Sequence, residues 1–86
     1  MPKRARPEVT QAILEVVENQ IRDGDPVETT TTIERLQRQG LLRPEAVRLI
    51  ACVVATEMFQ ILKFGETFNE QRFIANLNKL PTLPWD

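Results

Sequence analysis

The chain has 86 residues and a mass of 9.9 kDa, which is the size of one small domain. Its formal charge is -1 and 42% of its residues are hydrophobic, so a soluble domain with one core is predicted and a membrane protein is not. The sequence contains no His, Ser or Tyr, and its one cysteine is Cys52. This excludes Ser-His-acid triads, Cys-His pairs and the usual zinc ligand sets.

Neither a catalytic residue nor a metal site nor a cofactor is therefore predicted. A lone cysteine forms no internal disulfide and suits a reducing compartment. The longest apolar run covers residues 49–55, whereas a membrane-spanning helix needs about 20 residues. The basic residues near the start are followed by Glu8 and not by the apolar core of a signal peptide. We expect a cytoplasmic protein.

Glycine and proline divide the chain into four segments of helical period. Each glycine is expected to end a helix and each proline to begin one at its first position; they are Gly24, Gly40 and Gly65, and Pro7, Pro26 and Pro44. In chain order, helices are predicted for residues 7–23, for a segment that begins at 25–28, for residues 44–64, and for a segment that begins near Thr67 or Asn69. No segment alternates with period two, so no strand is predicted.

The predicted helices differ in their caps and in their apolar pattern. Asp25 and Glu28 form a capping-box-like start for the second helix, and Asn69 or Thr67 caps the fourth. The third helix is apolar over most of its circumference and must therefore be central. The prediction is a single all-α domain over residues 1–86: a compact four-helix domain with a long central third helix, a flexible basic head at 1–6 and an extended Pro-rich tail at 81–86.

Two polar residues fall on faces that should be buried. Projected at 100° per residue, Gln20 lies among the apolar residues of the first helix and Glu57 among those of the third. Glu57 would accept hydrogen bonds from Gln20, from Arg22 or Arg72, or from N–H groups at a helix start. The alternative, a general acid or base with a raised pKa, lacks a second catalytic group.

Three apolar residues are candidates for an interaction patch. Phe59 projects away from the densest apolar stripe of its helix, and the tail carries Leu83 and Trp85. The tail could fold back and cover Phe59, which is the simpler reading for a sole tryptophan. Otherwise these residues form an apolar patch for another chain or a second copy.

Basic residues offer a different hypothesis. The segment around Gly40 has some likeness to a helix-turn-helix, and the candidate phosphate contacts are Lys3, Arg4, Arg6, Arg43 and Arg48, with Arg38 nearby. The third helix is too long and apolar for that motif, Glu45 lies where DNA contacts would fall, and the net charge is negative.

A longer pattern resembles a family of small bacterial all-helical domains of unknown function. It consists of residues 18–26 (ENQIRDGDP), Leu36, Gly40, Glu45-Ala46, Leu49-Ile50 and Glu57-Met58-Phe59, within a match that spans about residues 13–80. The resemblance implies a helical domain and brings no activity or ligand with it. Some relatives carry histidines in the middle helices, which this chain lacks.

The leading functional hypothesis is a small non-catalytic protein-interaction or dimerisation module, with a protein partner or self-association. The alternative is a nucleic-acid-binding accessory protein that uses the basic head and the turn between the second and third helices. An enzyme built on Glu57 ranks third.

Overall fold

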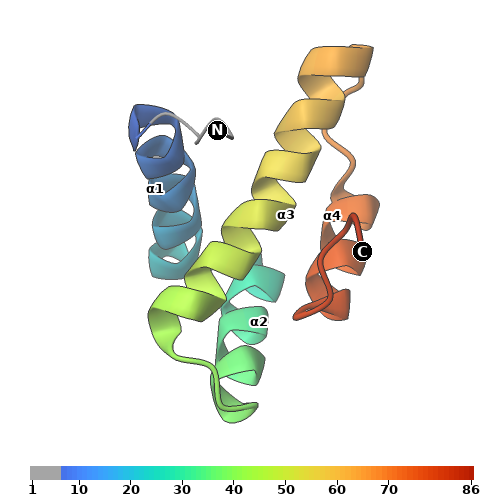
Figure 1. Ribbon diagram of the computed structural model, residues 1–86. Helices are drawn as coiled ribbons and strands as arrows, with labels where there is room; N and C mark the ends of the chain where they lie inside the picture. The colour runs from blue at the N-terminus through green and yellow to red at the C-terminus, as the bar shows by residue number, and fades with distance from the viewer. Residues whose placement is uncertain (1–6) are drawn as a thin grey trace.

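The computed structural model describes residues 7–86, so the predicted basic head at 1–6, with Lys3, Arg4 and Arg6, lies outside the described residues. Over 7–86 the chain forms four helices and no strand (Figure 1), which confirms the all-α four-helix prediction. The helices are α1 (Pro7–Asp23), α2 (Val27–Arg38), α3 (Arg43–Phe64) and α4 (Glu70–Lys79).

Two glycines close α1 and α2 in the same way. Gly24 and Gly40 have φ values of 65° and 101°, which a residue without Cβ adopts at little cost. After α1, the Gly24 N–H donates to the Ile21 carbonyl at 3.3 Å and the Asp25 N–H donates to the Gln20 carbonyl at 3.2 Å. This is the Schellman pattern, which satisfies carbonyls that a helix end leaves free.

The capping box predicted for α2 is wrong for a related reason. The backbone N–H of Asp25 completes the end of α1, and the N-cap of α2 is Pro26, which makes no side-chain cap hydrogen bond. The start of α4 follows the Asn69 alternative instead of Thr67. The Asn69 side chain accepts from the Arg72 N–H at 2.9 Å, and the rings of Phe68 and Phe73 lie 5.6 Å apart across the cap.

The start of α3 has only half of a capping box. Its N-cap is Leu42, whose backbone N–H donates to the Glu45 carboxylate at 2.9 Å, while a leucine side chain accepts nothing in return. Leu42 is 69% exposed, so little apolar contact is lost when it is replaced. We expect Leu42→Ser to complete the box and raise the free energy of unfolding by about 1 kcal/mol.

Urea unfolding followed by circular dichroism measures that change. Val27→Ser is the control, because Val27 is 61% exposed and is already inside α2, where a serine completes no capping box. An unfolding midpoint for Leu42→Ser at or below that of the unaltered chain would contradict the prediction.

The core is built around α3, as its apolar circumference predicted. α3 packs against α1, α2 and α4, and its residues Ile50 and Val53 have no exposed surface. The buried apolar residues come from all four helices and the residue after α4; they are Val17, Ile33, Leu36, Ala46, Val47, Ile50, Ala51, Val53, Val54, Phe73, Leu77 and Leu80.

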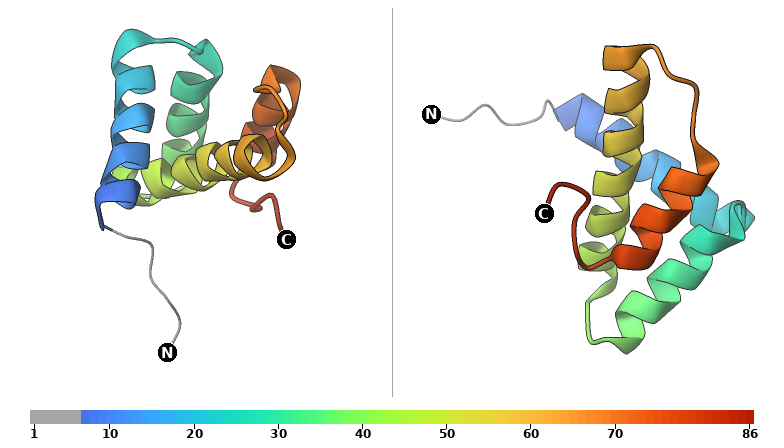
Figure 2. Two further views of the ribbon diagram at one scale, coloured as in Figure 1. Left: turned by 90° about the horizontal axis from the view of Figure 1, so that it is seen from above. Right: turned by 90° about the vertical axis from the view of Figure 1, so that its right-hand side faces the viewer.

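The other helices leave one side of α3 open. Seen from above, α2 and α4 lie behind α3 and α1 stands beside it, while no helix of residues 7–86 crosses its front (Figure 2, left). The C-terminal tail comes round to the same front side (Figures 1 and 2). None of the four helices is both long and apolar enough to cross a membrane.

The tail at 81–86 was expected to be extended, and it turns twice instead. The Thr82 N–H donates to the Lys79 carbonyl at 2.9 Å, and the Asp86 N–H donates to the Leu83 carbonyl at 3.1 Å. Pro84 is the second residue of the latter turn, a position for which its fixed φ is suited. Because of these turns, Leu83 packs against the core and the chain end lies near α3.

Candidate interaction surface

On the side of α3 opposite Glu57 lies an apolar strip, which we call the outer face: Cys52, Ala55, Phe59 and Leu62, with the buried Ala51 at its edge. From Cys52 onward these residues are spaced by three, four and three positions, the spacing that keeps side chains on one side of a helix. Phe59 is 49% exposed and Leu62 is 81% exposed. The side chains of the strip are small in its N-terminal half and large in its C-terminal half.

The small half of the outer face is the floor of a hollow between two helices. Ala51, Cys52 and Ala55 of α3 face Ile13 and Leu14 of α1 across a cavity of about 340 Å³, which we call the α1–α3 groove. Thr10 and Arg48 complete its lining. The groove is therefore walled mainly by apolar atoms, although Ile13 and Leu14 also pack against the core.

The large half of the outer face is bordered by the tail. Phe59 and Trp85 line one hollow of about 320 Å³ together with Ala55 and Thr56. The tail thus folds back to the predicted place, but Trp85 stays 63% exposed and Phe59 49% exposed. The three residues of the predicted patch separate accordingly: Leu83 packs on the core, and Phe59 and Trp85 remain at the surface.

Polar groups on the outer face are already satisfied or weakly reactive. The Thr56 hydroxyl donates to the Cys52 carbonyl at 2.9 Å, so covering it leaves no free donor. Burial raises the pKa of the Cys52 thiol, which keeps the thiolate scarce near neutral pH. Lys63 holds its ammonium 5.0 Å from the centre of the Phe59 ring. An apolar surface can therefore cover Cys52 and Thr56 without stranding a polar group, whereas the Lys63 ammonium has to stay in contact with water when Phe59 is covered.

Glu57 lies on the opposite side of α3 and is 2% exposed. Its two carboxylate oxygens accept from Nε and one terminal nitrogen of Arg72 at 2.6 and 3.0 Å. Arg72 also pairs with Glu66 at 3.1 Å, and the hydrogen bond to Glu57 is the main cause that raises the Arg72 pKa. A carboxylate held on both oxygens and closed to solvent has no access to a substrate.

Gln20 and Glu57 do not form a pair with each other. Gln20 is half-buried and its side-chain oxygen accepts from the Thr29 hydroxyl at 3.0 Å. Thr29 is fully buried on α2, so the hydrogen-bond partner of Gln20 comes from the helix that follows it. Each of the two residues thus found its own partner, because α1 packs its Gln20 end against α2 while Glu57 faces α4.

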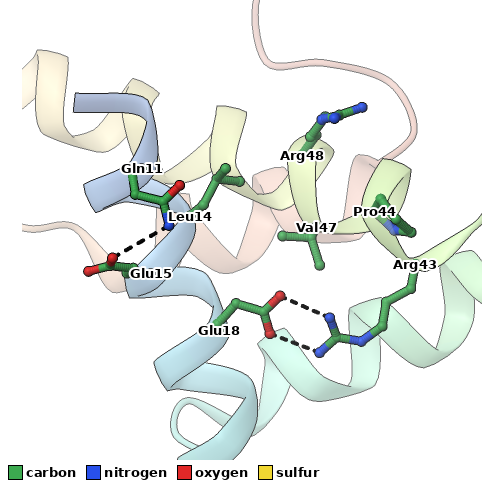
Figure 3. A pocket seen from close by; sticks show the side chains of 8 residues that line it. All are labelled: Gln11, Leu14, Glu15, Glu18, Arg43, Pro44, Val47 and Arg48. Carbon is green, nitrogen blue, oxygen red and sulfur yellow. Dashed lines mark hydrogen bonds and ion pairs between the residues drawn. The ribbon is translucent and has the colours of Figure 1, made fainter. Parts of the chain in front are cut away.

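A second cavity, lined by both charged and apolar side chains, lies between α1 and the start of α3 (Figure 3). Both terminal nitrogens of Arg43 donate to the Glu18 carboxylate at 2.9 Å, and this contact lowers the Glu18 pKa. Arg48 lines both this cavity and the α1–α3 groove. Of the predicted phosphate contacts within the described residues, Arg43 is therefore already occupied by a carboxylate.

Several parts of this surface were missed from the sequence. The three-four-three spacing of Cys52, Ala55, Phe59 and Leu62 was a usable signal for the outer face. The α1–α3 groove had no such signal, because the angle between α1 and α3 cannot be read from the sequence of either helix alone. Arg35 donates to the Leu77 and Leu80 carbonyls at 2.9 and 2.8 Å. These contacts join residues 42 and 45 positions apart, and no local sequence signal predicts them.

Comparison of the chain with protein-family models, with curated proteins and with solved structures finds no match. The resemblance to small bacterial helical domains stays a prediction, and any functional conclusion depends on the surface itself.

Proposed function

We propose that this chain is a small non-catalytic protein-interaction module that binds through the outer face of α3. The observation that carries the proposal is the exposure of Phe59, Leu62 and Trp85: helical spacing places Phe59 and Leu62 on the side of α3 away from Glu57, and Trp85 lies against Phe59. Scattered exposed apolar residues are ordinary on small proteins. Here they lie next to an apolar groove, and a contiguous apolar surface of this kind is typical of a binding site.

The composition of the face also suits binding. Interface centres are rich in aromatic residues and poor in charged ones, and the strip from Ala51 to Leu62 presents Phe59 with Trp85 beside it. Arg48 stands at one end and Lys63 at the other, where a polar rim is expected. The surface therefore has an apolar centre and charged ends.

The two other hypotheses have less support. Nucleic-acid binding would use Arg43, which is paired with Glu18 (Figure 3), and a second acidic residue, Glu15, lines the same cavity. Catalysis at Glu57 would need an accessible carboxylate, and Glu57 is 2% exposed and held by Arg72.

Affinity capture from the native cells tests the proposal. The tagged chain, the double variant Phe59→Glu with Leu62→Glu, and a Phe64→Glu control are compared after chemical cross-linking. Phe64 is a fair control because it lies on the same helix with 58% exposure, five residues after Phe59 and so about 140° round the helix.

We expect proteins, which can include the untagged chain itself, to be retained by the unaltered chain and by the Phe64→Glu control, and to be lost from the double variant. Retention by all three forms, or by none, would refute the proposal.

A further inference from the structure

We propose that the outer face binds a second copy of this chain, in a two-fold dimer in which Phe59 of each copy enters the α1–α3 groove of the other. The inference rests on the proposed function and names its partner. It starts from the fact that the projecting and the hollow parts of the face lie on the same helix.

The projection and the hollow are matched in size. The α1–α3 groove has a volume of about 340 Å³, and an apolar cavity of about 150 Å³ already admits a benzene ring. The groove is walled by Ile13, Leu14, Ala51, Cys52 and Ala55, which offer apolar contact to the Phe59 ring. Phe59 is the largest side chain on the strip and is half-exposed.

The groove and Phe59 also lie at positions along α3 that are compatible with a two-fold axis. The groove is centred near Ala51 and Cys52 and the projection is at Phe59, seven to eight residues later, or about 11 Å along the helix. An axis through the midpoint, between Ala55 and Thr56, pairs the two α3 helices antiparallel. It places Phe59 of each copy opposite Cys52 of the other, and both insertions occur at once, as a closed two-fold interface requires.

The residues at the midpoint permit close approach. Ala55 has a small side chain, and the Thr56 hydroxyl is satisfied by the Cys52 carbonyl, so two helices can meet there without a stranded donor. A foreign partner would have to supply both a small segment and an aromatic residue at this separation, whereas a second copy supplies both by symmetry.

The available area fits a reversible dimer. Aromatic side chains have about 150 to 250 Å² each, and Phe59 and Trp85 leave 49% and 63% of theirs exposed, to which Leu62 and the groove add. Weak specific complexes bury less than about 1,200 Å² in total, or about 600 Å² per partner. An interface of this size is typical of weak, reversible complexes, so we expect the dimer to dissociate between micromolar and millimolar chain concentrations.

Sedimentation equilibrium of the purified full chain from about 1 μM to about 1 mM tests the dimer. We expect the average mass to rise from one to two chains, and Phe59→Ala to raise the dissociation constant at least about 30-fold, as for a central interface residue. Phe64→Ala, on the other side of the helix, should change it less than about threefold. Circular dichroism confirms that both exposed-site variants remain folded.

Cross-linking tests the antiparallel arrangement. In a Cys52→Ala background, Ala55→Cys places a thiol near the axis, and we expect mild oxidation to join two chains through it. The native Cys52 should not cross-link, because its copies lie on opposite sides of the axis, about 10 Å apart along the helix, beyond the reach of a disulfide.

The outcomes separate this inference from the proposed function. A chain that stays monomeric at about 1 mM, or a dimer that Phe59→Ala leaves unchanged, overturns the two-fold model. Efficient cross-linking through native Cys52, or none through Ala55→Cys, overturns it as well. If the chain is monomeric but captures a different protein through Phe59, the proposed function stands and only the self-pairing is wrong.

Discussion

Leu36→Ala is expected to lower the free energy of unfolding by about 3 kcal/mol. Leu36 has no exposed surface and lies where α2 meets the core, so the truncation removes apolar contacts and leaves a cavity. Its carbonyl also accepts the Leu41 N–H at the end of α2, so the packing and the turn after α2 depend on the same residue. For a domain of this size the loss corresponds to a fall in Tm of more than 10 °C.

Urea unfolding at about 1 μM chain, below the expected dimer range, measures the loss without a contribution from association. Leu62→Ala is the matched control, because Leu62 is 81% exposed on the outer face and should cost less than about 0.5 kcal/mol. If Leu36→Ala and Leu62→Ala lower the free energy of unfolding equally, the burial of Leu36 is not what stabilises the fold.

The second large effect concerns the pair formed by Glu57 and Arg72. We expect Arg72→Met to destabilise the fold more than Glu57→Gln, although both break the same contact. Glu57 is 2% exposed, so the loss of Arg72 leaves its buried carboxylate without a partner, and a stranded charge of this kind costs about 3 kcal/mol. Without the Glu57 charge, Arg72 keeps Glu66 at 3.1 Å and remains partly open to water.

A double-mutant cycle checks this asymmetry. The variant with both Glu57→Leu and Arg72→Met replaces the pair by apolar side chains, which is often tolerated in protein interiors. Its loss of stability should be smaller than that of Arg72→Met alone, and urea unfolding of the single and double variants gives the comparison. Equal losses for Glu57→Gln and Arg72→Met would show that water, and not the arginine, compensates the carboxylate.

Much of the fold could be predicted because its signals are local. Gly24 and Gly40 end helices, which short-range backbone geometry decides, and the burial of Glu57 follows from the projection of a single helix. The cap at Asp25 failed because one residue can complete the preceding helix or begin the next one, and its backbone N–H went to Gln20. The sequence alone does not decide between these two uses.

The surface was harder to predict because its features depend on how elements meet. Phe59 and Trp85 were predicted to lie together. Phe59 falls outside the apolar stripe of its own helix, and Trp85 is a lone tryptophan in the tail, so each feature can be read from one local segment. How far the tail covers Phe59 depends on two turns, at Thr82 and at Asp86. The groove beside Ala51 depends on the angle between α1 and α3, which is set by the whole core.

The position of Trp85 has a practical consequence. It is the only tryptophan of the chain, and it sits half in water at the edge of the outer face, against Ala55, Thr56 and Phe59. Indole emission shifts to the blue when solvent leaves the ring. The intrinsic fluorescence of Trp85 can therefore report when a partner covers the border of the proposed contact, without any attached dye.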